Sequence, residues 1–208
     1  MPNNLQNARF DKRGDKNTNQ NQKHDNKSSS IDTQLLNELE GKKNKLFGLI
    51  KDDKGFCDGD KARYDVAVLL EDFARLLGCE YLTGGSNKAG ITSNSIRNVY
   101  DSYIAIKRRF QTNEISLISN SQVSGDLKEK AFEEIRPELI FAKAKVNYLV
   151  QRKISELKNS DNDRATKRAY EAFKEFIYIS TDKITSSYKQ FEAFMDLFET
   201  LIGFLKKQ

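Results

Sequence analysis

Basic side chains gather in two stretches of this 208-residue sequence, and their types and spacing suit the binding of phosphate. Residues 84–112 contain five Lys or Arg and one acid, and residues 136–158 contain six Lys or Arg and two acids. Ammonium and guanidinium groups donate charge-assisted hydrogen bonds to phosphate oxygens. The two stretches therefore predict a surface that contacts a phosphate backbone. Its candidate residues are Lys88, Arg97, Lys107, Arg108, Arg109, Arg136, Lys143, Lys145 and Arg152.

In the second stretch, basic and aromatic residues alternate at helical spacing. Phe141, Lys145, Tyr148 and Arg152 follow one another at steps of four, three and four, so a helix places them on one face. Basic groups beside aromatic rings can hold a nucleic-acid backbone and stack its bases. The alternative is structural: the two rings pack inward and the two cations extend along the margin of the core.

In the first stretch, Arg97 and Arg108 stand eleven residues apart, about three helical turns or roughly 16 Å. They should lie along one polar edge, and we expect this edge to face the same ligand as the Lys145/Arg152 edge. Asp101, one turn after Arg97, can form an exposed ion pair worth only about 0.3–0.5 kcal/mol, which a phosphate can displace. Lys107 falls near the apolar stripe of the helix, where we expect it to be half-buried.

The sequence lacks the residue patterns of catalysis. Its only histidine, His24, lies in a polar N-terminal segment, so the base of a hydrolase is missing. The glycine-containing stretch 84–88 lacks the spacing of a phosphate-binding P-loop. Two cysteines cannot form a metal site alone. We therefore expect a protein that is not an enzyme and needs no cofactor.

The elements that must position these residues are helices. Only two prolines occur, there is no tryptophan, and apolar residues recur at helical period after residue 31. Residues 1–30 are rich in Asn, Gln, Lys, Asp and Ser and cannot bury enough apolar surface to order. The prediction is an all-α protein: a disordered polar arm (1–30), followed by a single compact bundle domain (31–208) of about five to six helices.

Capping residues and breakers set the expected boundaries. Asp32 or Thr33 should cap the first helix, and Asp58 or Asp60 the second. A break is expected before Pro137, because the residue preceding a proline avoids the helical conformation. The C-terminal aromatic series should form the core, with a possible break at 180–182. The helices are expected at about 32–50, 60–77, 92–110, 126–135, 137–157 and 164–206, with a loop or short helix at 111–125.

Composition also bears on the compartment. The net charge is +5, which permits contact with an anionic polymer or a membrane surface. The N-terminus has no apolar signal core, and no apolar run approaches the roughly eighteen residues of a membrane span. The expectation is a cytoplasmic protein with free thiols and no membrane contact.

Three segments, in this order, resemble the small subunit of type III-A CRISPR effector (Csm) complexes. The segment 90–100 resembles the family's leucine-threonine-threonine/serine helix start, which continues to isoleucine/leucine-arginine-asparagine; here the last three are Ile96, Arg97 and Asn98. The segment 137–145 is similar to the family's proline-lysine-leucine-alanine-tyrosine-alanine-alanine-glycine-arginine helix. The aromatic end, 191–204, is similar to the family's last helix. The resemblance covers roughly residues 60–205.

The resemblance implies a compact helical bundle without nuclease activity that serves antiviral defence. Several copies would lie along the duplex of guide RNA and target RNA, beside other subunits, and contact phosphates without reading sequence. The implied partners are therefore both RNAs, other subunits and copies of itself, with no small-molecule substrate. Carried over by position, Arg97 and Lys145 are the strongest contact candidates. Glu138 departs from the pattern, because the family has a lysine there.

The alternative function is a helical scaffold or adaptor that binds another protein and has no nucleic-acid role. It would use the acidic outer surface of the second helix, where residues 58–81 carry six acids against three bases, or the aromatic C-terminal face.

Overall fold

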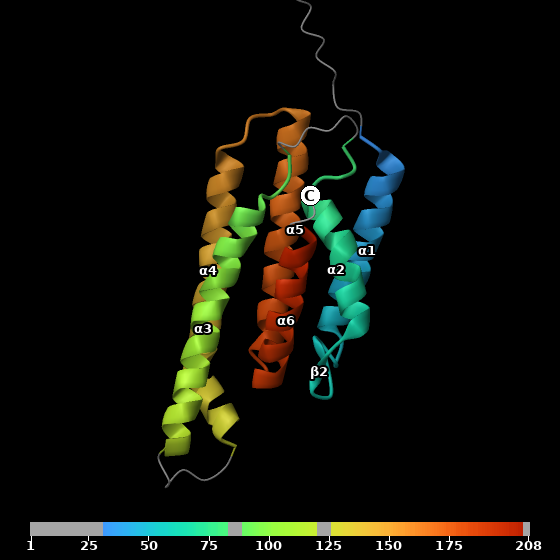
Figure 1. The fold of residues 1–208 in the computed structure, drawn as a ribbon. Helices are drawn as coiled ribbons and strands as arrows, with labels where there is room; N and C mark the ends of the chain where they lie inside the picture. The colour runs from blue at the N-terminus through green and yellow to red at the C-terminus, as the bar shows by residue number, and fades with distance from the viewer. Residues whose placement is uncertain (1–30, 83–88, 120–125, 206–208) are drawn as a thin grey trace, which may run out of the picture.

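The computed structural model describes residues 31–82, 89–119 and 126–205, and this part of the chain is a six-helix bundle (Figure 1). The all-α prediction is confirmed, with one addition: a hairpin of two-residue strands joins the first two helices. The predicted arm, 1–30, lies outside the described residues. The elements are α1 (Thr33–Lys51), β1 (Cys57–Asp58), β2 (Lys61–Ala62), α2 (Tyr64–Leu77), α3 (Ser93–Ser119), α4 (Leu127–Ser155), α5 (Asp161–Ile184) and α6 (Tyr188–Leu205).

The helices form three pairs arranged side by side. In Figure 1, α3 and α4 lie at one side, α1 and α2 at the other, and α5 and α6 between them. The long α3–α4 pair extends beyond the other helices at its lower end. None of the helices in the described ranges is long and apolar enough to cross a membrane.

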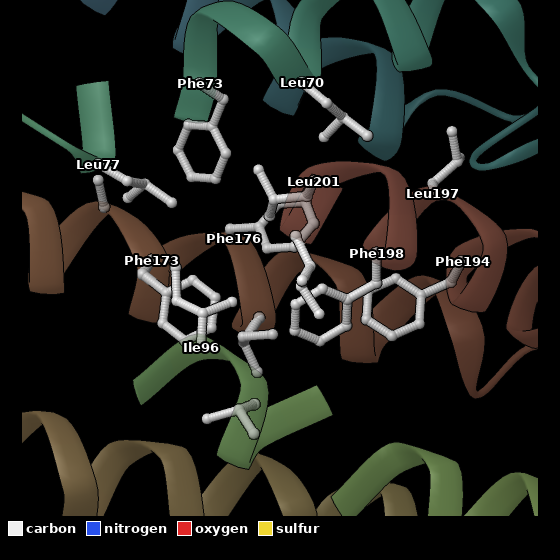
Figure 2. Close-up of a cluster of buried hydrophobic side chains, with 14 of the residues drawn as sticks. Leu70, Phe73, Leu77, Ile96, Phe173, Phe176, Phe194, Leu197, Phe198 and Leu201 are labelled. Atoms are coloured by element: carbon white, nitrogen blue, oxygen red, sulfur yellow. The ribbon is translucent and has the colours of Figure 1, made fainter. Parts of the chain in front are cut away.

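The aromatic C-terminal series forms the centre of the core, as predicted. Figure 2 shows Phe173 and Phe176 of α5 beside Phe194 and Phe198 of α6, between side chains of α2 and α3. The ring centroids of Phe194 and Phe198 are 5.3 Å apart. Because this face is buried, the aromatic C-terminal surface suggested for an adaptor is not available to a partner.

The break between α5 and α6 lies after Ile184, not at 180–182 as suggested. Ser180 and Thr181 are fully buried, and the Thr181 hydroxyl donates to the carbonyl of Ile177, 2.8 Å away within the helix. The burial of this turn in the core outweighs the local preference of Ser and Thr for turns, so the helix continues.

The start of α2 differs from the prediction. Asp32 caps α1 as expected, but neither Asp58 nor Asp60 caps α2, because residues 57–62 form the hairpin. The buried guanidinium of Arg63 connects the end of α1 to the start of α2: it donates to Asp52 at 2.7 Å and to Asp65 at 2.7 Å. This cluster ties the end of α1 and the hairpin to the first turn of α2.

Two helices are longer than the sequence predicted. α3 continues to Ser119, into the stretch 111–125 expected to be a loop or short helix, of which 120–125 lies outside the described residues; its Thr112 and Ser119 hydroxyls donate to carbonyls one turn earlier. The expected break before Pro137 is wrong, because α4 runs through it. Pro137 removes one helical hydrogen bond, but the fully buried Ile135 and Leu139 on either side hold both halves of α4 to one core face.

Candidate nucleic-acid interface

An open groove of about 660 Å³ lies on the surface of the bundle between the antiparallel helices α3 and α4. Its walls combine short polar side chains of α3 with an aromatic ring and charged groups of α4. The lining residues are Asn98, Asp101, Ser102, Ala105, Ile106 and Arg109 from α3, and Glu138, Phe141, Ala142 and Lys145 from α4.

Of the two predicted basic edges, one contributes directly to this groove. Lys145 lines it from α4, and Arg152 lies two turns further along the same exposed face. On α3, Arg97 and Arg108 are exposed and stand next in sequence to the lining residues Asn98 and Arg109, but they are not part of the lining. The predicted cations in the lining are therefore Arg109 and Lys145.

The aromatic residues of α4 point outward. Phe141 is 65% exposed and Tyr148 is 68% exposed, so the alternative in which both rings pack inward is wrong. Lys145 lies between the two rings on the same face and is also exposed. This part of α4 therefore presents alternating rings and cations to solvent.

Some of the predicted cations on α3 and α4 form ion pairs, and others form none. Arg109 donates to Glu138 at 2.5 Å, and Arg152 to Glu156 at 3.4 Å. Within the described ranges, Arg97, Arg108 and Lys145 form no ion pair. These three side chains are the ones that a phosphate can bind without displacing a carboxylate.

Two further candidates lie elsewhere on α4. Arg136 contacts Glu129 at 3.1 Å and Glu133 at 2.9 Å on its own helix, and its guanidinium lies 5.3 Å from the ring centroid of Phe132. Arg136 and its two partners form an ion-pair network within α4, and none of the three residues lines the groove.

Lys143 faces α5. Its ammonium lies 2.8 Å from the Asp182 carboxylate and 4.5 Å from the ring centroid of Tyr178. These contacts commit the cation to the α4–α5 packing, so the helix turns Lys143 away from Lys145.

Lys107 and Lys88 complete the predicted set. Lys107 is half-buried, as expected, and lines a separate groove against α6 with Lys128, Tyr188 and Glu192. Lys88 lies outside the described residues.

The sequence prediction missed the short uncharged side chains of the groove. Asn98, Ser102 and Ala105 precede the predicted Arg109 at steps of four, three and four, the same spacing that singled out the α4 face. Short side chains at the first three of these positions leave room between the helices. Attention to charge alone overlooked them, although the spacing was visible in the sequence.

The described residues show no group of three or more His, Cys, Asp or Glu side chains arranged to hold a metal ion. The described lining offers a ligand amide and hydroxyl groups, the cations Arg109 and Lys145, the carboxylates Asp101 and Glu138, and the ring of Phe141. Its cations and its ring suit an anionic polymer that carries flat rings.

A model of the family described as Csm2 Type III-A matches residues 70–208. The match begins inside α2 and includes α3 to α6, so it covers both walls of the groove. α1 and the hairpin precede it. No curated protein and no solved structure matches the chain.

Proposed function

Because the chain belongs to the Csm2 family and is thus a small subunit of a type III-A CRISPR effector complex, we propose that it binds the complex's RNA through the α3–α4 groove. Family membership implies association with the other Csm subunits and with the guide RNA. The proposal adds that both guide RNA and target RNA are contacted along their phosphates, without sequence readout.

One observation carries this proposal: Lys145 lines the groove, Arg97 and Arg108 are exposed on α3 next in sequence to its lining residues, and within the described ranges none of the three forms an ion pair. Cations that track a backbone supply affinity and position, while base pairing between guide and target supplies specificity. A surface of this kind needs no base-edge contacts.

The lining of the groove supports a non-catalytic role. Its polar groups are amide, hydroxyl, carboxylate and basic side chains, and the described lining contains neither histidine nor cysteine. Such groups hold and orient a backbone. Several copies along one RNA would add their affinities through multivalency, so a modest contact surface in each copy is sufficient.

The test is the double variant Arg97→Ala/Lys145→Ala, one residue from each of the two helices that line the groove. We expect it to stay folded and to bind RNA more weakly. The slope of log binding constant against log salt concentration should become shallower by about 1.4–1.8 for two lost phosphate contacts. Binding would be measured by fluorescence anisotropy with labelled RNA from about 20 to 200 mM salt, and folding by circular dichroism.

The matched control is Lys45→Ala/Lys51→Ala, which removes two exposed cations from α1, a helix that does not line the groove. It changes net charge equally, so any general electrostatic effect appears in both variants. If the two variants behave alike, the groove is not the RNA site. If wild-type chain binds the other subunits but no RNA at low salt, the adaptor function replaces the proposed one.

A further inference from the structure

We infer that the exposed rings of Phe141 and Tyr148 stack on unpaired bases, so that this surface prefers RNA with unpaired nucleotides over a continuous duplex. The inference rests on the proposed function and names the form of RNA that the groove recognises. It follows from two large aromatic side chains that α4 leaves in solvent.

The two rings are not part of the core. Each exposes about two thirds of its surface, and neither stacks on another ring of the described residues. They stand seven residues apart, which is about two turns or roughly 10.5 Å along the helix axis. Their spacing keeps both on one side of α4, and Phe141 also lines the groove.

The charges around the rings favour a nucleotide over a protein partner. Lys145 lies between Phe141 and Tyr148, and Arg152 follows Tyr148 by one turn, so each ring has a cation one turn away. A nucleotide presents the same pair of features, a flat base and an anionic phosphate. The core of a protein interface is instead depleted in charged residues, lysine in particular.

Stacking on a side chain requires a free base face. In a continuous duplex the faces of the bases cover one another, so only the phosphates and the groove edges are accessible. Unpaired or splayed nucleotides can place a base on a ring while their phosphates reach Lys145 or Arg152. The cations then bind any RNA, and the rings add affinity only where bases are unpaired.

The experiment compares three RNAs of equal length with the full chain at one low salt concentration: a single strand, a blunt duplex and a duplex with two bulged nucleotides. The test variant is Phe141→Leu/Tyr148→Leu, which keeps apolar side chains but removes the rings. Wild type should prefer the single strand and the bulged duplex. The variant should lose about fivefold or more in affinity for these two, with the blunt duplex unchanged.

The control is Tyr64→Leu, which removes a ring that is 83% exposed on α2, away from the groove. It should leave all three affinities unchanged. A second measurement places 2-aminopurine at the bulge: stacking should quench its fluorescence on binding wild type and the control, but not the Phe141→Leu/Tyr148→Leu variant.

The outcomes separate this inference from the proposed function. An equal loss on all three RNAs, or no loss, overturns base stacking while RNA binding stands. If the ring variant keeps its RNA preference but binds another Csm subunit more weakly, the rings are a protein contact and the inference is overturned. If wild type binds none of the three RNAs, both the inference and the proposed function are overturned.

Discussion

Arg109 of α3 and Glu138 of α4 are joined across the groove by an ion pair, with 2.5 Å between Nη1 and Oε1. The arginine side chain is 65% exposed and the carboxylate 28% exposed, so the pair lies at the surface. Glu138 is the position at which the sequence resemblance led us to expect a lysine. The carboxylate therefore neutralises a cation of the proposed RNA surface.

Glu138→Gln should strengthen RNA binding. The change removes a negative charge from the groove and frees Arg109 to bind phosphate. A surface pair of this kind is worth about 0.2–1 kcal/mol, so the expected gain is up to about fivefold at low salt. Fluorescence anisotropy measures it. The control Glu175→Gln removes an exposed carboxylate from α5 and should give a smaller gain; equal gains would mean that only net charge matters.

Lys143→Ala should lower stability and Lys145→Ala should weaken RNA binding, although the two residues are only two positions apart on α4. Lys143 pairs with Asp182 and lies over the ring of Tyr178, so its loss should lower the free energy of unfolding by about 1 kcal/mol and leave RNA affinity unchanged. Lys145 forms no ion pair within the described ranges, so its loss should weaken RNA binding and leave stability unchanged. Urea unfolding and anisotropy on both variants check this; a loss of RNA affinity in Lys143→Ala would extend the RNA surface to the α5 side of α4.

Arg63→Met should destabilise the protein more than the loss of Lys143, Lys145 or Arg75. Arg63 is 7% exposed, and it donates to Asp52, to Asp65 and to the carbonyls of Leu49 and Gly55. Removing it leaves these acceptors without their donor, at an expected cost of about 2–4 kcal/mol measured by urea unfolding.

The control for Arg63 is Arg75→Met. Arg75 also contacts two carboxylates, but its side chain is far more exposed, so we expect a loss below about 1 kcal/mol. Comparable losses in the two variants would show that the burial of Arg63 contributes little.

The Arg63 cluster also predicts a loss of stability in acid. Burial acts to raise the pKa of Asp52, but hydrogen bonds from Arg63 and from the Gly55 N–H outweigh it and lower that pKa. The hydrogen bond from Arg63 likewise lowers the pKa of Asp65. Both carboxylates bind protons more readily in the unfolded chain, so their contribution is present above about pH 4 and is lost as pH falls through the lowered values.

This acid dependence can be assigned to Arg63 by comparison. Thermal unfolding between about pH 2.5 and 5 should show a steeper fall in Tm for wild type than for Arg63→Met, because the variant no longer holds the two pKa values down. Parallel curves would mean that the acid loss arises from other carboxylates.

Pro137→Ala should stabilise α4. The proline is exposed inside a continuous helix, where it lacks the N–H that would donate to the carbonyl of Glu133. Alanine restores this donor, and we expect a gain of about 1–3 kcal/mol in the free energy of unfolding. The control Glu134→Ala, on the exposed side of the same turn, should change stability by less than about 0.5 kcal/mol. A loss of stability in Pro137→Ala would mean that α4 requires the rigidity of proline.

The sequence by itself determined the features that depend on local spacing. Apolar residues at helical period predicted an all-α bundle with an aromatic core, and Asp32 predicted the start of α1. The steps of four, three and four from Phe141 to Arg152 predicted their shared face on α4. These features need only the geometry of one helix, which the order of residues fixes.

Only the tertiary structure decided where helices continue and which of them meet. α4 passes through Pro137 because Ile135 and Leu139 are buried against other helices, an effect that outweighs a local preference. The exposure of Phe141, the contact of Lys143 with α5 and the pairing of Arg109 with Glu138 likewise depend on how α4 is rotated against its neighbours. That rotation is set by the burial of apolar side chains from residues far apart in the chain, so helical spacing defines the faces and packing decides which face is left in solvent.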